Sequence, residues 1–290
     1  MRTRRIVSFF VWDIYTAAAI KHFRVNNPDA SAPLINAQGI HVGNLPEDVA
    51  LRLESEFLQC KQLKWRDQRP EGYSFDPFIS AKDGPVRDAL TAHREMSDAM
   101  RAVLDEALTL LAPKIEAVLG HHWSAGAARL FSQMAEQHGP AHIDQWPFGL
   151  HKIMIYPSGA GPEQGSTVLF LEQGPTMITG RKGVWSIFEN SIVMHRAGGP
   201  QAGHPPRPTI EITILPAFRT EPRVKAHGIH VGYPWLPPDI EGLEGDGVLR
   251  AFTSRAVKRR SLLRSIMLAA DLPATVKIPE ATVGLGYYDI

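Results

Sequence analysis

The spacing of apolar residues along the chain changes near residue 120. From residue 86 to 119 apolar residues recur at intervals of three and four, which predicts an amphipathic helix with a break or kink at Pro113. After Gly120, short runs rich in Val, Ile, Phe and Thr alternate with Gly and Pro turns. The runs cover residues 128–134, 151–156, 166–172, 176–179, 184–190, 192–195 and 209–218. Short strands separated by turns in this way predict an antiparallel sandwich or barrel.

The N-terminal third predicts a strand followed by a helix. Residues 39–43 are typical of a short strand, and Pro46 lies where the first turn of a helix is expected. The residues Leu51, Phe57 and Leu58 are expected on the apolar side of that helix. Because helices come first along the chain and strands follow, we expect an α+β fold with the helices outside one sheet.

The element order indicates one domain that covers residues 1–290. We expect a helical and loop part at 1–127, a β core at 128–218 and a C-terminal extension at 219–290. The extension contains a basic stretch at 254–270, which predicts an amphipathic helix with a solvated basic face. A phosphate-bearing or membrane-surface partner for that stretch is the alternative.

The composition is that of a soluble globular protein. The 290 residues are 44% hydrophobic and 21% charged, and 31 Lys and Arg against 30 Asp and Glu give a net charge of +1. This balance argues against a nucleic-acid partner. With Cys60 as the single cysteine, the chain cannot form an internal disulfide, which favours the cytoplasm. The apolar run at 6–20 is short for a membrane span and contains Asp13, so we expect a buried first element and no integral membrane contact.

Three residues have the types and spacing of a metal site. His142 and Asp144 are two positions apart, so on a strand both side chains project from one face. An imidazole and a carboxylate on one face supply two ligands for a divalent metal, although an isolated pair of this kind is weak evidence. His195, at the end of a later strand-like run, adds a second imidazole. Two histidines and one carboxylate form the facial triad of non-haem iron(II) oxygenases.

The sequence around these residues resembles the iron(II)/2-oxoglutarate-dependent dioxygenases over residues 128–218. The motifs that carry the resemblance are HIDQW at 142–146, HRAGGP from His195 and RPT at 207–209. The stretch 39–57 is more loosely similar to the start of the phytanoyl-CoA hydroxylase-like branch. The resemblance implies a double-stranded β-helix, which is a jelly-roll or cupin-like barrel, with flanking helices.

The resemblance also implies the cofactors and the reaction. It assigns iron(II) to His142, Asp144 and His195, with 2-oxoglutarate and O2 as co-substrates and ascorbate as a supporting reductant. The keto acid would be decarboxylated to succinate while the substrate is oxidised. Because halogenating relatives lack the carboxylate ligand, Asp144 favours hydroxylation. The nucleic-acid demethylase branch carries a second arginine six residues after the first, and Thr213 occupies that position here.

Three further residues are candidates for binding the keto acid. The resemblance places Arg207 on the remote carboxylate of 2-oxoglutarate, with the Thr209 hydroxyl beside it. A guanidinium suits this role because its planar fork binds a carboxylate through two hydrogen bonds. Thr209 shares a strand face with Arg207, since the two are two residues apart. Gln133 is either a third contact or an ordinary glutamine on a sheet face.

Two other kinds of function are compatible with these patterns. One is a cupin-like metalloenzyme that does not use 2-oxoglutarate, and the other is a non-catalytic β-barrel that binds a ligand. For the enzyme we expect a small-molecule substrate, such as an amino-acid or lipid derivative. The sequence leaves the oligomeric state open.

Overall fold

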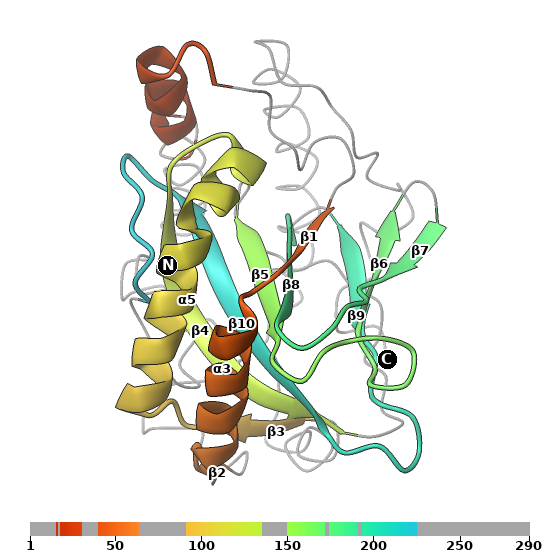
Figure 1. Ribbon diagram of the computed structural model, residues 1–290. Helices are drawn as coiled ribbons and strands as arrows, with labels where there is room; N and C mark the ends of the chain where they lie inside the picture. The colour runs from red at the N-terminus through yellow and green to blue at the C-terminus, as the bar shows by residue number, and fades with distance from the viewer. Residues whose placement is uncertain are drawn as a thin grey trace, which may run out of the picture.

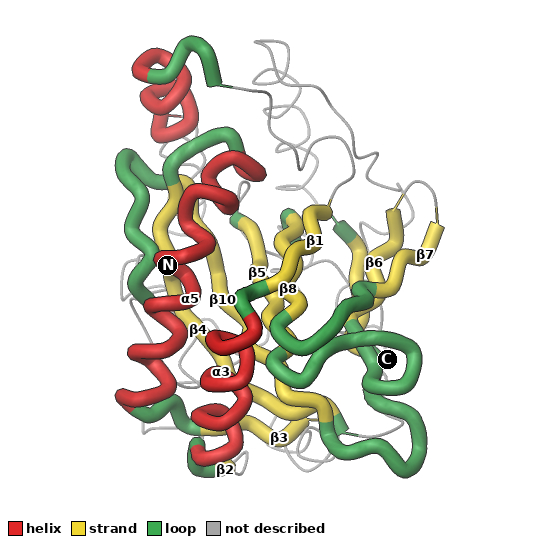
Figure 2. Tube along the Cα trace, viewed as in Figure 1, coloured by secondary structure: helices red, strands yellow, loops and turns green. Residues whose placement is uncertain are grey.

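Two antiparallel sheets and a layer of helices make up the fold (Figure 1). The structure is a computed structural model, and Figure 2 shows the described parts in colour. The described residues are 16, 18–30, 40–63, 91–134, 150–171, 174–190 and 193–224. The basic stretch at 254–270 and the rest of the expected extension beyond residue 224 lie outside them.

The larger sheet has seven strands in the order β1-β8-β5-β10-β4-β3-β2. Their bounds are β1 Ile40–Asn44, β2 Gln62–Leu63, β3 Thr91–Arg94, β4 Trp123–Gln133, β5 His151–Tyr156, β8 Val184–Phe188 and β10 Arg207–Pro216. The smaller sheet has the order β7-β6-β9, with β6 Thr167–Leu171, β7 Gly174–Met177 and β9 Met194–Ala197. Each of the seven runs expected after Gly120 overlaps a strand, and the pairings are antiparallel, so the antiparallel architecture is confirmed.

Two helices lie over one face of the larger sheet, as Figure 1 shows. They are α3 (Glu47–Gln59) and α5 (Asp98–Leu119), and residues 18–26 are also helical. The Ser97 hydroxyl starts α5 by accepting a hydrogen bond of 3.1 Å from the backbone N–H of Met100. Gly120 ends the helix in the left-handed conformation, with φ 66°. The expected placement of helices outside one sheet is confirmed.

The prediction of a helix over 86–119 is wrong for residues 91–97. Residues 91–94 form β3, whose backbone pairs with β4, and the helix begins at Asp98. Pairing with a neighbouring strand here outweighs the local helical pattern. Pro113 does not end the helix, which continues to Leu119. β4 begins at Trp123 and not at residue 128, because Trp123 still pairs with Pro216 of β10.

The buried side of α3 also differs from the expectation. The helix begins at Glu47, directly after Pro46, and Phe57 is buried as predicted. Leu51 and Leu58, however, are 47% and 59% exposed. The helix buries Val49, Ala50, Leu53 and Phe57. These positions are spaced by one, three and four residues and so define a single stripe along the helix.

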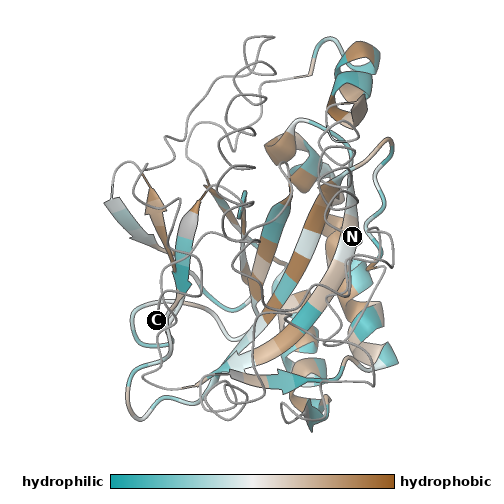
Figure 3. Ribbon diagram, turned by 180° about the vertical axis from the view of Figure 1, so that it is seen from behind, coloured by the Kyte–Doolittle hydropathy of each residue, from teal (hydrophilic) through white to brown (hydrophobic). Residues whose placement is uncertain are grey.

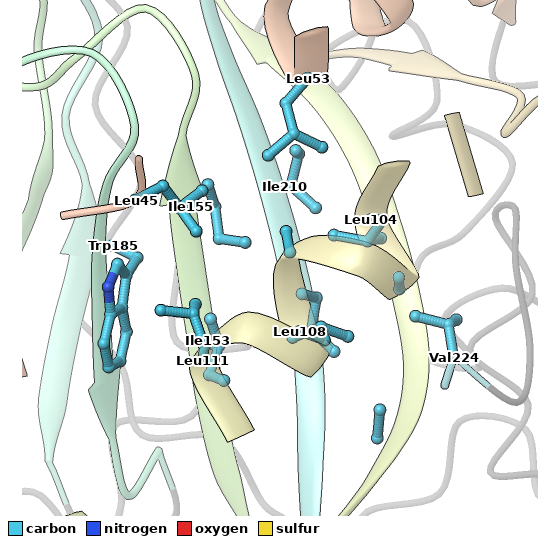
Figure 4. Close-up of a cluster of buried hydrophobic side chains, with 14 of the residues drawn as sticks. Leu45, Leu53, Leu104, Leu108, Leu111, Ile153, Ile155, Trp185, Ile210 and Val224 are labelled. Atoms are coloured by element: carbon cyan, nitrogen blue, oxygen red, sulfur yellow. The ribbon is translucent and has the colours of Figure 1, made fainter. Parts of the chain in front are cut away.

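The main hydrophobic core lies between these helices and the larger sheet. Figure 4 shows Leu104, Leu108 and Leu111 of α5 in the same cluster of buried side chains as Ile153 and Ile155 of β5. Gly183 allows the close approach of α3, because a Cβ atom there would lie 2.5 Å from the Cβ of Ala50 and its φ is +75°. The helices therefore cover one face of the larger sheet, and the smaller sheet lies against the other face.

A second cluster of buried side chains lies on the opposite face of the larger sheet. It joins Tyr156 and Phe188 of that sheet to Leu169 of the smaller one. Along the strands, residues facing the helices alternate with residues facing the smaller sheet, and Figure 3 shows the resulting change of hydropathy along the ribbon. We call the face turned toward the smaller sheet the inner face.

Candidate active site

The inner face of β10 is buried and polar. It carries Arg207, Thr209, Glu211 and Thr213, all of them buried. The isoleucines between them, Ile210, Ile212 and Ile214, face the helices. Four consecutive inner positions with hydrogen-bonding side chains are unusual in a protein interior, where such groups need partners.

Arg207 is a cation that is buried on the inner face. The residue is 3% exposed, and its Nε and Nη1 atoms have no hydrogen-bond partner among the described residues. Its guanidinium carbon lies 4.9 Å from the centre of the Tyr156 ring, within the range of a cation–π interaction. Burial lowers the pKa of the guanidinium, and Tyr156 acts in the opposite direction. Arginine remains charged even so, which makes this end of the inner face a site for an anion.

Polar residues surround Arg207. Tyr156 donates a hydrogen bond of 2.7 Å to the hydroxyl of Thr167, which connects the two sheets at this level. Gln133 of β4 lies directly opposite Arg207 in the strand register, and it is buried. Thr209 is fully buried on the same face, with its hydroxyl 3.5 Å from the carbonyl of Arg207. The structure therefore places Arg207, Thr209 and Gln133 near one another, and their role in binding the keto acid stays a prediction.

His195 lies on β9, in the smaller sheet that faces this surface. It is buried, and its ring meets that of Phe188 edge to face at a centroid distance of 5.0 Å. Its Nδ1 atom is 2.9 Å from the carbonyl oxygen of Val193. A carbonyl can only accept, so Nδ1 carries the proton and the lone pair of the neutral ring is on Nε2. This is the tautomer of a histidine that binds a metal through Nε2.

The other two predicted metal ligands, His142 and Asp144, lie outside the described residues. Within the described part of the chain, no three His, Cys, Asp or Glu side chains come together as a metal site. The expected triad therefore stays a prediction, for which the structure supplies the position and the tautomer of His195.

Three charged residues form a second polar group on the inner face. Glu211 makes ion pairs with Arg129 of β4 and with Lys152 of β5, and its Oε2 lies 3.5 Å from the Lys152 Nζ. The side chains of Lys152 and Glu211 are each 6% exposed, and that of Arg129 is 21% exposed. We refer to Arg129, Lys152 and Glu211 as the charged cluster.

The charged cluster lies toward the His195 end of the inner face. Lys152 is paired in register with Phe188, the residue against which His195 packs. Tyr156, beside Arg207, is four residues further along β5, which corresponds to about 13 Å. The inner face thus carries Arg207 at one end and the charged cluster with His195 at the other.

Sequence reasoning did not single out Arg129 or Glu211. The two-residue period of a strand could have indicated Glu211, because it follows Arg207 and Thr209 on the same strand face. Arg129 has the same relation to Gln133 on β4. That Glu211 would meet both Arg129 and Lys152 depends on the strand register, which was not available from the residues.

Among the described residues, no helix is long and apolar enough to cross a membrane. No protein-family model matches the chain, and no curated protein matches it.

Several solved structures are similar to parts of the chain. One is the non-haem α-ketoglutarate-dependent epimerase SnoN from nogalamycin biosynthesis, with a TM-score of 0.48, 13% identity and coverage of 79% of this chain and 92% of that one. HygX from Streptomyces hygroscopicus, with nickel, 2-oxoglutarate and hygromycin B bound, has a TM-score of 0.44, 14% identity and coverage of 64% and 86%. A prolyl-4-hydroxylase from Pseudomonas putida has a TM-score of 0.42, 13% identity and coverage of 63% and 95%. No residue role in this chain is taken from these similarities.

Proposed function

We propose that the protein is an iron(II)- and 2-oxoglutarate-dependent oxygenase built on a double-stranded β-helix. The observation that carries the proposal is Arg207, a cation buried on the inner face whose Nε and Nη1 have no hydrogen-bond partner among the described residues. Burying a charge without partners costs several kcal/mol, so an arginine in this state is explained by an anion that it binds.

The remote carboxylate of 2-oxoglutarate fits this arginine. The guanidinium fork matches a carboxylate through two hydrogen bonds, while Tyr156 stacks under the guanidinium and limits its movement. Thr209 lies on the same face and has a hydroxyl that can donate a further hydrogen bond. In this role Arg207 orients the keto acid along the inner face toward His195.

His195 fits a ligand of iron(II), and His142 and Asp144 would complete the site. The hydrogen bond from Nδ1 of His195 to the carbonyl of Val193 places the lone pair of the ring on Nε2, which is the atom that would bind a metal. When bound, iron(II) would supply the activation of oxygen that couples decarboxylation of the keto acid to oxidation of the substrate. The carboxylate of Asp144 favours hydroxylation as the outcome.

Further properties are part of the same proposal. The substrate is a small molecule, and nucleic acid is not a partner, since the net charge is only +1. The single cysteine favours the cytoplasm. Membership of the phytanoyl-CoA hydroxylase-like branch is supported by β1 and α3, which form the strand and helix expected over 39–57.

An anaerobic titration of 2-oxoglutarate into the iron(II)-loaded protein tests the proposal. We expect a metal-to-ligand charge-transfer absorption with the natural chain. In Arg207→Lys the fork is lost while the charge remains, so the affinity for 2-oxoglutarate should fall roughly ten- to a hundredfold. The affinity for iron should not change, because Arg207 is not a ligand.

Arg219→Lys is the matched control, because Arg219 is an exposed arginine that pairs with Glu221 on the surface. It should bind 2-oxoglutarate as the natural chain does. Equal binding by Arg207→Lys would remove the reason for naming this co-substrate. Substrate oxidation without succinate would then favour the cupin-like alternative, and a protein that binds no iron would favour the non-catalytic barrel.

A further inference from the structure

A hydrogen bond between two buried side chains links the Arg207 end of the inner face to the smaller sheet. Tyr156 of β5 donates it to the hydroxyl of Thr167 on β6 over 2.7 Å, and the two residues are 0% and 3% exposed. Because burial excludes water from this place, the bond is electrostatically stronger than one on the surface. The ring of Tyr156 lies against Arg207, with its centre 4.9 Å from the guanidinium carbon.

Thr167 is also a neighbour of His195 within the smaller sheet. His195 of β9 is paired in register with Leu169 of β6, which lies two residues beyond Thr167. Residues two apart on a strand share a face, so Thr167, Leu169 and His195 project from the same side of this sheet. Thr167 and His195 are thus diagonal neighbours on adjacent strands, with Cα atoms about 7–8 Å apart. The residue that holds Tyr156 therefore lies beside the predicted iron ligand.

These contacts connect the two groups that the proposed function assigns to opposite ends of the keto acid. Arg207 would bind the remote carboxylate, while His195 would belong to the metal site at which the keto end is held. Arg207 lies in the larger sheet and His195 in the smaller one. Their separation therefore depends on how the two sheets are held together, and the bond between Tyr156 and Thr167 joins the sheets at this place.

The guanidinium of Arg207 depends on a neighbour for its exact position. Its Nε and Nη1 atoms have no hydrogen-bond partner among the described residues. An arginine side chain has several rotatable bonds, so a guanidinium without support can meet a carboxylate at more than one distance. The Tyr156 ring restricts it on one side through the cation–π contact. A shift of that ring would therefore shift the place at which Arg207 binds a carboxylate.

We propose that Thr167 is a positioning residue that makes the site selective for the chain length of 2-oxoglutarate. By holding the hydroxyl of Tyr156, Thr167 sets where Arg207 lies relative to His195. The position of Arg207 in turn decides which length of keto dicarboxylate reaches both ends of the site. The inference rests on the proposed function, since it takes 2-oxoglutarate to be the co-substrate.

The test compares 2-oxoglutarate with oxaloacetate, which is one methylene shorter, and with 2-oxoadipate, which is one methylene longer. Each is titrated anaerobically into the iron(II)-loaded protein, and the metal-to-ligand charge-transfer absorption gives its affinity. The natural chain should prefer 2-oxoglutarate to both. Tyr156→Phe and Thr167→Val each remove the bond and nearly keep the side-chain volume. In both variants the preference for 2-oxoglutarate should fall roughly threefold to tenfold.

Two further variants separate a positioning role from a purely structural one. Thr167→Ser keeps the hydroxyl that accepts the bond, so it should keep the natural preference. Ile155→Val is the matched control, because Ile155 is next to Tyr156 on β5 but is buried on the helix side. It removes one buried methyl group, so it should reduce stability as Tyr156→Phe does and leave the preference unchanged.

Thermal unfolding measures the stability of all four variants. If either Tyr156→Phe or Thr167→Val does not fold, the other gives the result, since each removes the same bond. An unchanged preference in these variants overturns the inference, as does an equal loss of preference in Ile155→Val. A natural chain that binds all three keto acids equally also overturns it.

The same titrations distinguish this inference from the proposed function. In each of the results that overturn the role of Thr167, the natural chain still binds 2-oxoglutarate, and the proposed function stands. If the natural chain binds none of the three keto acids, the proposed function is wrong and the inference falls with it.

Discussion

The two faces of the larger sheet are both buried, and they differ in what is buried on them. The face under α3 and α5 is lined by residues such as Ile153, Ile212 and Trp185. The inner face, built from the same strands, carries Arg207, Lys152 and other polar side chains beside its aromatic residues. Burial alone therefore does not distinguish a face that stabilises the fold from one that binds a ligand; the chemical nature of the buried groups does.

Burial contributes to the free energy of folding with opposite sign on the two faces. Burying apolar surface under the helices contributes about 25 cal/mol per Å2 to folding. Burying ionic groups on the inner face costs free energy that their mutual attraction returns only in part. We therefore expect substitutions under the helices to reduce stability, and substitutions at Arg207 to reduce binding while stability rises.

The largest effect is expected from Leu108→Ala on the helix side. Leu108 is fully buried against the larger sheet, so the substitution removes apolar contacts and leaves a cavity. The free energy of unfolding should fall by about 2–5 kcal/mol in urea denaturation. Leu110→Ala, on the same helix but 53% exposed, is the control and should change it little. Equal effects of the two would contradict the assignment of the buried side of α5.

His121 should make the stability of the helix side depend on pH. Burial lowers the pKa of His121 to about 4 from the usual 6.5, and the neighbouring His151 ring, with its centroid 6.3 Å away, acts in the same direction. The unfolded chain therefore binds more protons than the folded one between these values, so stability falls as the pH is lowered from 6.5 to 4. The loss should amount to about 3 kcal/mol.

Urea denaturation at several pH values between 7 and 4 measures this dependence. His121→Gln should flatten the curve, because the group that takes up the proton is gone. His204→Gln, in a loop outside the helix layer, should keep the slope of the natural chain. A slope that is unchanged in His121→Gln would show that other groups cause the loss of stability.

Arg207→Met should raise stability and abolish co-substrate binding. The substitution removes a buried charge and keeps most of the side-chain volume, so the free energy of unfolding of the ligand-free protein should rise by about 1–3 kcal/mol. Urea denaturation measures the first effect, and the anaerobic titration of 2-oxoglutarate measures the second. A fall in stability would mean that Arg207 serves the fold, and the contrast between the two faces would then not hold.

The smallest effect is expected from Tyr156→Phe on the inner face. The ring that stacks on Arg207 is kept, and the hydrogen bond to Thr167 between the two sheets is lost. The free energy of unfolding should fall by about 1–2 kcal/mol, because the Thr167 hydroxyl is left buried without this partner. Thermal unfolding of Tyr156→Phe and Thr167→Val compares the two sides of the bond. A similar loss in both variants would support the bond, and no loss in either would contradict it.

The sequence predicted most of the strands and the strand face that Arg207 and Thr209 share. Strand β5 has the expected bounds, 151–156, because its apolar run is flanked by turn residues. The two-residue period of β10 placed Arg207 and Thr209 on one face, and the structure brings them together with Gln133. These results follow from local rules, since strand formation and the side on which a residue projects depend on near neighbours along the chain.

Other features depended on contacts between residues far apart in the sequence. Residues 91–94 became a strand because β4 offers a pairing edge, although their surroundings were typical of a helix. Leu51 and Leu58 are exposed because α3 lies on the sheet through a different stripe. The ion pairs of Glu211 with Arg129 and Lys152 exist only because β10 lies between β4 and β5 in one register. Alternation along a strand places successive residues on two faces. Strand order and helix placement decide which face packs against the helices and which faces the smaller sheet.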